Sequence, residues 1–140
     1  MAKSFHCTVT TPEARILSED CTSAVVPMHD GQMGFLADRA PIVGKMGLGE
    51  LRLLFTTGGS RSYLVENGFV NMVGDKLTIL AERATPAEQL NESEAQTELA
   101  AAQNRVAKDP EDRERITREL ERARAKLSVA RAFKSRGGGI

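Results

Sequence analysis

The spacing of apolar residues changes near residue 84, and this change limits the folds that the chain can adopt. Residues 5–10 (FHCTVT) and 76–82 (KLTILAE) alternate apolar and polar side chains. Alternation of this kind sends successive side chains to opposite faces of a β-strand. Beyond residue 84 the apolar residues recur every three or four positions, which is the spacing of an amphipathic helix. We therefore expect a β-domain over residues 1–84 and a helical domain over residues 85–140.

The first part of the chain carries turn-forming residues every eight to twelve positions. Short strands with regular turns predict an antiparallel sandwich or barrel. Residues 50–56 and 61–66 are expected to form a hairpin. Because both faces of this hairpin carry apolar groups, one face should be core and the other should be covered by a partner or by the helices. The expected turns are Thr11-Pro12, His29-Asp30-Gly31, Gly58-Gly59, Asn67-Gly68 and Gly74-Asp75.

The second part predicts two helices. The first can begin at Thr85-Pro86-Ala87-Glu88 or at Asn91-Glu92-Ser93-Glu94, because both have the residue order of a helix start. The second should begin with Asp109 as cap and Pro110 in the first turn, and should end at the glycines 137–139. The apolar stripes are Ala95, Leu99, Ala102 and Val106 in the first helix, and Ile116, Leu120, Ala123, Leu127 and Ala130 in the second.

Two helices with a short connection should form an antiparallel hairpin. The seam between them is rich in alanine, and a buried alanine contributes much less than the ~1.5–3 kcal/mol of a large apolar side chain. We therefore expect a hairpin that can open, and about forty helical residues placed end to end would reach roughly 60 Å.

Few residues are suited to chemistry. His6 and His29 lack the spacing of a zinc site, and no nucleophile and base can be paired, so we expect no metal and no catalytic residue. Glu50 is expected to be a solvated strand residue. The glycines of residues 31–49 do not form a phosphate-binding loop. Cys7 and Cys21 are expected to be free, partly buried thiols. Residues 1–13 lack the apolar stretch of a secretory signal, and no apolar run approaches the roughly 18 residues of a membrane span.

The chain has 19 basic and 19 acidic residues, so its overall charge favours neither nucleic acid nor membrane. The second helix, however, is locally basic. One interpretation is a solvated face with ion pairs one turn apart, such as Glu114 with Arg118. The other is an arm that contacts an acidic protein surface or phosphates. Aromatic residues are scarce there, which counts against a platform for single-stranded nucleic acid.

Two stretches carry a resemblance to a known family. "VPMHDGQMGFLADRAPIVGKMGLGELRL" and "ENGFVNMVGDKLTILAERA" stand in the order and at the spacing found in the epsilon subunit of F-type ATP synthases. The helical part has the expected length, so the resemblance covers essentially the whole chain. It implies a sandwich of about ten strands followed by a helical hairpin. It also implies a non-catalytic rotor subunit that couples c-ring rotation to ATP synthesis through the gamma subunit, as a peripheral protein on the cytoplasmic side of the energy-coupling membrane.

The resemblance also implies the contact residues. Those that match the c-ring loop are His29, Asp30, Gly31, Gln32 and Met33, and Gln32 stands where a Glu is common. Those that match the segment facing gamma are Arg39, Ala40, Pro41 and Ile42, and Arg39 replaces the common His. In the family the extended helices inhibit ATP hydrolysis, so the basic side chains expected to meet the catalytic beta subunit are Arg115, Arg118, Arg122, Arg124 and Lys126.

Some members of this family bind ATP through Ile/Leu-Asp-x-x-Arg-Ala at the start of the first helix. Here Asn91 replaces the Asp and Glu94 replaces the Arg. A carboxylate in place of a cation repels phosphate, so we expect no useful ATP binding. The alternatives to the rotor subunit are a free-standing nucleotide-sensing module and a module that binds nucleic acid through its basic helix.

Overall fold

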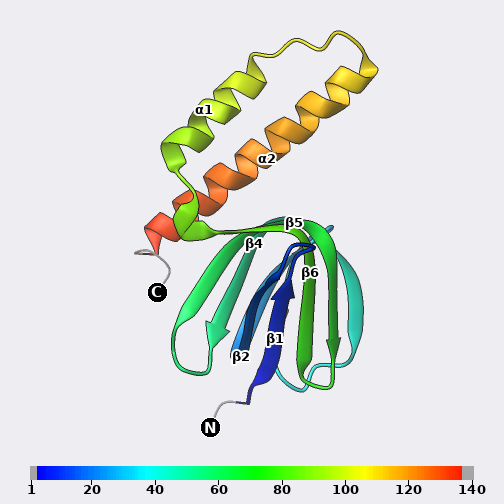
Figure 1. Ribbon diagram of the computed structural model, residues 1–140, viewed down its shortest axis with the longest axis vertical. Coiled ribbons are helices and arrows are strands. Elements are labelled where there is room, and N and C mark those ends of the chain that lie inside the picture. Colours follow the sequence, from blue (N-terminus) through cyan, green and yellow to red (C-terminus); the bar gives the residue numbers. More distant parts are fainter. Residues whose placement is uncertain (1–2, 137–140) are drawn as a thin grey trace.

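The computed structural model describes residues 3–136 and shows a β-sandwich with a helical hairpin at one end (Figure 1). The expected sandwich and hairpin are confirmed. The strands are β1 (Phe5–Thr10), β2 (Arg15–Met28), β3 (Gly31–Phe35), β4 (Ile42–Phe55), β5 (Ser60–Val73) and β6 (Lys76–Pro86). A 3₁₀ turn, η1 (Ala87–Gln89), leads to the helices α1 (Glu92–Gln103) and α2 (Pro110–Ser135).

The sheet has the order β1-β6-β5-β4-β2-β3, and β1 also pairs with β2, so the strands curve around a common core. The β1–β6 pair is parallel, and the other pairs are antiparallel. Phe5, Phe35 and Leu51 are among the side chains that fill the interior. Cys7 and Cys21 are free, as expected, and both are fully buried in this core.

The described residues form six strands, four of them long, whereas the resemblance implied about ten. Asn67-Gly68 was expected to be a turn but lies inside β5, with positive φ angles of 56° and 118°. The inward side chains are Tyr63 and Val65 before this point and Val70 and Met72 after it. Two left-handed residues therefore shift the alternation, which lets one continuous strand serve both layers.

The expected hairpin around Gly58-Gly59 is confirmed, with Phe55 N donating to the Gly59 carbonyl at 2.8 Å. Of the two possible starts for the first helix, the structure uses the second. The Asn91 side chain accepts a hydrogen bond from Glu94 N at 3.1 Å, whereas residues 85 and 86 still belong to β6. Strand pairing of these two residues with β5 prevents them from starting a helix.

The first helix is shorter than its apolar stripe predicted. It ends at Gln103, so Val106 is not a seam residue but lies in the connection with 84% of its surface exposed. The start of α2 is confirmed, because Asp109 accepts a hydrogen bond from Asp112 N at 2.8 Å and Pro110 follows it. α2 ends at Ser135, and the predicted end at 137–139 lies outside the described residues.

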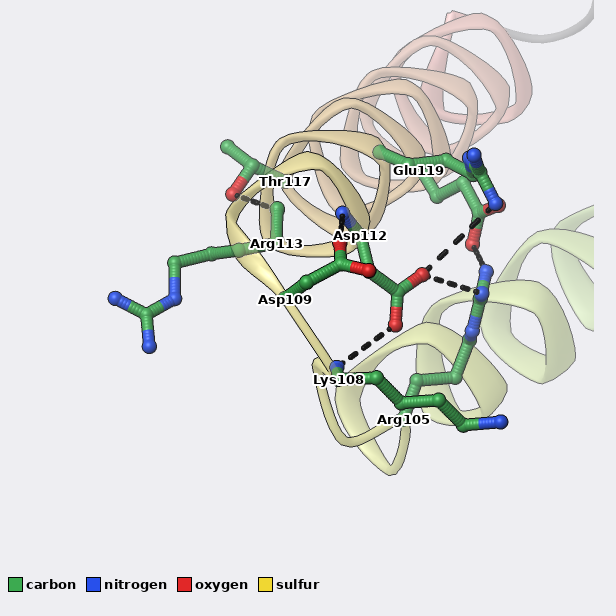
Figure 2. Close-up of polar contacts among 8 residues, drawn as sticks. Arg105, Lys108, Asp109, Asp112, Arg113, Thr117 and Glu119 are labelled. Atoms are coloured by element: carbon green, nitrogen blue, oxygen red, sulfur yellow. Dashed lines mark hydrogen bonds and ion pairs between the residues drawn. The ribbon is translucent and has the colours of Figure 1, made fainter.

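The connection between the helices is held by Arg105. Figure 2 shows its guanidinium reaching Asp112, at 3.6 Å, and Glu119, both on α2. Asp112 also accepts a hydrogen bond from Lys108 N at 3.0 Å. The hairpin is therefore closed by polar contacts at its connection as well as by the alanine-rich seam.

Candidate interaction surfaces

Two faces of the second helix pack on other parts of the chain. Ile116, Ala123 and Leu127 are buried on the side that packs on α1, as the sequence predicted. A second stripe packs on the sheet, where Val129 is buried together with Leu64 of β5 and Ala87 of η1. Partly buried residues around this small cluster are Leu48, Leu90, Ala125 and Phe133. The apolar contact between hairpin and sheet is therefore narrow.

Two ion pairs flank this apolar contact. Arg122 Nε donates to Glu66 Oε1 at 2.8 Å, and Arg136 Nη2 donates to Glu50 Oε2 and, at 3.2 Å, to Ser62 Oγ. Glu50, expected to be a solvated strand residue, is only 14% exposed at its side chain. The expectation was wrong because the end of α2 covers this part of β4. Both glutamates lie on the sheet face that carries Leu64.

The five basic residues matched to the beta-subunit contact do not share one face of α2. Arg122 points to the sheet, Lys126 pairs with Glu98 of α1 at 3.1 Å, and Arg115 lies 3.9 Å from Asp112. Arg118 and Arg124 are exposed and form no ion pair within residues 3–136. The expected Glu114–Arg118 pair is likewise not formed among these residues. Two of these five residues, Arg122 and Lys126, therefore join α2 to the sheet and to α1.

Of the residues matched to the c-ring loop, His29 and Asp30 form the turn between β2 and β3, and Gly31, Gln32 and Met33 begin β3. Asp30, Gly31 and Gln32 are exposed. His29 N donates to the Lys45 carbonyl at 3.1 Å, which fixes the turn to β4. Gly31 has a φ of 131°, a conformation that favours glycine.

The residues matched to gamma lie next to this turn. Ala40 and Pro41 are exposed in the loop before β4, and Ile42 begins the strand. Arg39 Nη2 lies 3.4 Å from Met33 Sδ, and the guanidinium lies 5.1 Å from the centre of the Phe35 ring. The structure thus brings the two sequence-predicted segments together through Arg39 and Met33. The Nε of Arg39 is buried and has no hydrogen-bond partner.

An open cleft lies between the start of α1 and the end of α2, at the altered ATP motif. Asn91, Ser93, Phe133 and Lys134 are among its lining residues. Glu92 also lines it and pairs with Arg131 at 3.0 Å and Lys134 at 3.7 Å. The hydrogen bond from Arg131 and the charge of Lys134 lower the pKa of Glu92. The cations at this cleft are therefore already paired.

Two further titratable groups, His6 and Cys7, have partners within the sandwich. His6 lies 2.8 Å from Asp20 and 2.7 Å from Ser18, across the β1–β2 pair. A hydrogen bond with Cys21, together with burial, raises the pKa of the Cys7 thiol. Within residues 3–136 no group of three or more His, Cys, Asp and Glu side chains is placed to hold a metal ion. Among the same residues no helix combines the length and the apolar character needed to span a membrane.

Sequence reasoning missed the sheet-facing stripe of α2. The signal was present, because Arg122, Ala125, Val129, Phe133 and Arg136 recur at spacings of three and four. The stripe was not recognised because the arginines at its two ends are typical of a solvated face. Their partners, Glu50 and Glu66, lie far away in the sequence.

Comparison with known proteins gives a consistent result. Residues 4–87 match the family described as ATP synthase, Delta/Epsilon chain, beta-sandwich domain. The ATP synthase epsilon chain of Rhodopirellula baltica is 35% identical over 128 residues, which cover 91% of this chain and 99% of the relative. The sodium-ion-specific ATP synthase epsilon chain of Propionigenium modestum is 28% identical over 132 residues, covering 93% and 96%.

Solved structures show the same fold. A chain of the Euglena gracilis mitochondrial ATP synthase (OSCP/F1/c-ring) aligns with a TM-score of 0.75 at 18% identity, over 95% of this chain and 81% of its own. A chain of the central stalk and c-ring of the Tetrahymena thermophila enzyme aligns with a TM-score of 0.64 at 12% identity, over 91% and 97%.

Proposed function

The chain belongs to the epsilon chains of ATP synthases, and from this premise we propose that it couples c-ring rotation to the gamma subunit and restrains ATP hydrolysis through its helices. An epsilon chain is a stalk subunit and is not itself catalytic. The observation that carries the proposal is identity of 35% extending over 91% of the chain, through both sandwich and hairpin. The protein would reach the cytoplasmic side of the membrane only through the complex.

The coupling role is supported by the position of the two loops. His29–Met33 would meet the c-ring and Arg39–Ile42 would meet gamma. The contact of Arg39 with Met33 and Phe35 links these segments directly, so a force on one loop has a short packed path to the other. Gln32 would offer the ring a hydrogen bond in place of the ionic contact of a Glu.

The inhibitory role is supported by how the arginines of α2 are used. While the hairpin is docked, Arg122 is held by Glu66 and Lys126 by Glu98. Of the five matched residues, a beta subunit would then find Arg118 and Arg124 free of ion pairs among residues 3–136. Release of α2 from the sheet would make Arg122 available, and separation of α2 from α1 would make Lys126 available, so docking and inhibition compete for these two groups. Charge complementarity of this kind mainly sets orientation and capture rate.

A truncated chain tests the inhibitory role. The cut should follow Leu90, because residues 84–86 pair with β5 and belong to the sandwich. Reconstituted complex with the truncated chain should hydrolyse ATP faster than complex with the full chain. In the full chain, Arg118→Ala with Arg124→Ala should also raise hydrolysis, whereas Arg113→Ala, an exposed arginine of the same helix, should not. If complex with the truncated chain hydrolyses ATP at an unchanged rate, the inhibitory role is refuted and the coupling role is unaffected.

We also propose that this chain does not respond to ATP directly. Asn91 caps α1 through Glu94 N, and Glu92 neutralises Arg131 and Lys134, which leaves the phosphates without a free cation in the cleft. Calorimetry on the full chain should detect no binding at millimolar ATP. A dissociation constant below about 1 mM, or roughly −4 kcal/mol, would contradict this.

A further inference from the structure

We propose that Cys7 and Cys21 form a site of reversible oxidation, at which a small peroxide converts the two thiols into a disulfide that joins β1 to β2. The proposal goes beyond the rotor function and does not depend on it. Three features support it: the contact between the two thiols, the chemical difference between them, and a groove that leads to them from the surface. The chain contains two cysteines, so oxidation within one chain gives a single disulfide.

The two thiols are neighbours on the inner face of the sheet. Strand register pairs Phe5 with Cys21 and Cys7 with Glu19, so the two cysteines lie diagonally across the β1–β2 pair. Diagonal neighbours on one face of an antiparallel pair can interact. Here both side chains are fully buried, and the thiols are hydrogen-bonded to each other. A disulfide between them therefore joins strands that are already paired.

The two thiols differ in the way that a reactive dithiol requires. The hydrogen bond from Cys7 lowers the pKa of the Cys21 thiol. The same hydrogen bond, together with burial, raises the pKa of the Cys7 thiol. Because the thiolate is the nucleophilic form of cysteine, Cys21 is the sulfur that attacks the peroxide. Cys7 is the second thiol, which completes the disulfide.

A surface groove of about 330 Å³ leads to the thiols. Its lining includes Glu19, whose carbonyl accepts a hydrogen bond from Cys21 Sγ at 3.8 Å, and Phe55, the register partner of Cys21 on β4. Tyr63 also lines the groove. Burial is the main cause that raises the pKa of Tyr63, and Cys7 is a smaller one, so Tyr63 lies near the second thiol. A molecule as small as hydrogen peroxide can approach from this groove, whereas burial keeps bulky thiol reagents away.

The groove is open because the first half of β2 has a strand neighbour on one side only. In the part of the chain that the structure describes, residues 15–20 of β2 pair with β1, and pairing of β2 with β4 begins at Cys21. The hydrogen bond from Thr56 N to the Asp20 carbonyl, at 3.1 Å, closes the seam at that point. The thiol pair therefore lies where the groove ends and the closed sandwich begins.

The oxidation takes place in two steps. The Cys21 thiolate attacks one oxygen of the peroxide, so that an S–O bond forms, the O–O bond breaks, and the departing hydroxide takes up the proton that Cys21 gave up. Cys7 then attacks the sulfur of this sulfenic acid, so that the S–S bond forms, the S–O bond breaks, and the oxygen leaves as water with the Cys7 proton. The thiols lose two electrons to the peroxide, which ends as two molecules of water. A dithiol reductant reverses the change by thiol–disulfide exchange.

The disulfide would fix the point where β2 passes from one neighbour to the next. Cys21 pairs with Phe5 on β1 and with Phe55 on β4. A link to Cys7 closes the short loop between residues 7 and 21, which restricts the unfolded chain. The melting temperature of the oxidised sandwich should therefore exceed that of the reduced form by about 5 °C or more.

Peroxide treatment of the purified full-length chain tests the proposal. Mass spectrometry of the digested protein should find a peptide in which Cys7 is linked to Cys21, and dithiothreitol should remove the link and the gain in melting temperature. Cys7→Ser should leave a sulfenic acid on Cys21, which dimedone traps. Cys21→Ser should leave Cys7 unmodified at the same peroxide concentration.

A pair of tryptophan variants tests the groove. Ile16 lines the groove and is 38% exposed, so Ile16→Trp should obstruct it and slow disulfide formation by about fivefold or more. The matched control is Leu54→Trp, because Leu54 is 40% exposed but is not among the residues that line the groove. Thermal unfolding of each variant before oxidation confirms that the sandwich is intact.

Several outcomes would overturn the proposal. In the wild-type chain these are a disulfide between different chains, a sulfinic acid on Cys21 without a disulfide, and two thiols that peroxide leaves unmodified. Equal rates of disulfide formation in Ile16→Trp and Leu54→Trp would overturn the groove as the route of entry. None of these results bears on the rotor function, because the oxidation is measured on the isolated chain.

Discussion

Removal of the charge of Glu50 should weaken the docking of the second helix on the sheet. Glu50 on β4 binds Arg136, 86 positions further along the chain, and Ser62 joins the same guanidinium. Glu50→Gln keeps the size of the side chain and removes its charge. The helix then keeps its narrow apolar contact around Val129 and Leu64 and its second ion pair, Arg122 with Glu66.

The size of the effect follows from the burial of the pair. The side chain of Glu50 is 14% exposed and that of Arg136 is 22% exposed. Exposed pairs contribute about 0–1 kcal/mol, and loss of one partner from a fully buried pair costs about 3–5 kcal/mol. A charged hydrogen bond in this intermediate setting corresponds to about 1.5–3 kcal/mol. The ratio of docked to detached helix should therefore fall roughly ten- to a hundredfold.

Energy transfer between two labels measures this ratio. One label is placed at Ser128→Cys, exposed on α2, and the other at Thr57→Cys in the turn between β4 and β5. Cys7 and Cys21 are buried and should not react. A urea titration of the transfer signal gives the free energy of detachment, which Glu50→Gln should lower by the amount estimated above.

Glu88→Gln is the control for this experiment. Glu88→Gln removes a carboxylate whose 3.5 Å pair with Arg61 is half exposed, and it should change the free energy of detachment by less than about 0.5 kcal/mol. If Glu50→Gln behaves like Glu88→Gln, the apolar contact alone docks the helix and the reasoning is wrong.

Three further predictions concern the fold and the hairpin. Gly68→Ala should lower the free energy of unfolding, measured by denaturant titration, by about 3 kcal/mol or more. At Gly68 φ is 118°, and an added Cβ would lie 1.9 Å from the Leu80 carbonyl oxygen. The control is Gly34→Ala, whose added Cβ would meet no atom within 4 Å and which should cost less than about 1 kcal/mol. A result in which both variants unfold alike would contradict this. Arg105→Ala should speed proteolysis of the connection 104–109, since it removes both links to α2, and an unchanged cleavage rate would show that the alanine seam suffices. Because the pKa of Glu92 is lowered in the folded protein, its contribution to stability is present above the ordinary carboxyl pKa of 4.5 and is lost as pH falls through the lower folded value. The difference in stability between wild type and Glu92→Gln should therefore vanish in acid. A difference that stays constant with pH would argue against the ion pair with Arg131.

The period of the apolar residues gave the fold class correctly, because side-chain alternation and helical spacing are local properties of the backbone. The start of α2 was predictable for the same reason, since Asp109 and Pro110 act within one turn. The number of strands was not predictable in this way. Asn67-Gly68 is a common turn sequence, and only pairing with β4 and β6 on both sides keeps it inside a strand.

The candidate contact residues, like the fold, were predictable from the sequence only in part. Residue order placed the loops of His29–Met33 and Arg39–Ile42, whose packing on each other through Met33 required the structure. The basic character of α2 was visible in the sequence. Which of its cations are free was not, because Glu50, Glu66 and Glu98 come from other elements.

The sequence by itself determined a strand-rich domain, two capped helices and membership of a family, since each depends on neighbouring residues or on motif order. The tertiary structure decided that α2 is docked on the sheet, that the end of α2 covers Glu50, and that Phe69 and Leu80 are exposed. These facts depend on groups brought together from distant positions, and the ion pairs and sheet faces that result exist only after the chain has folded.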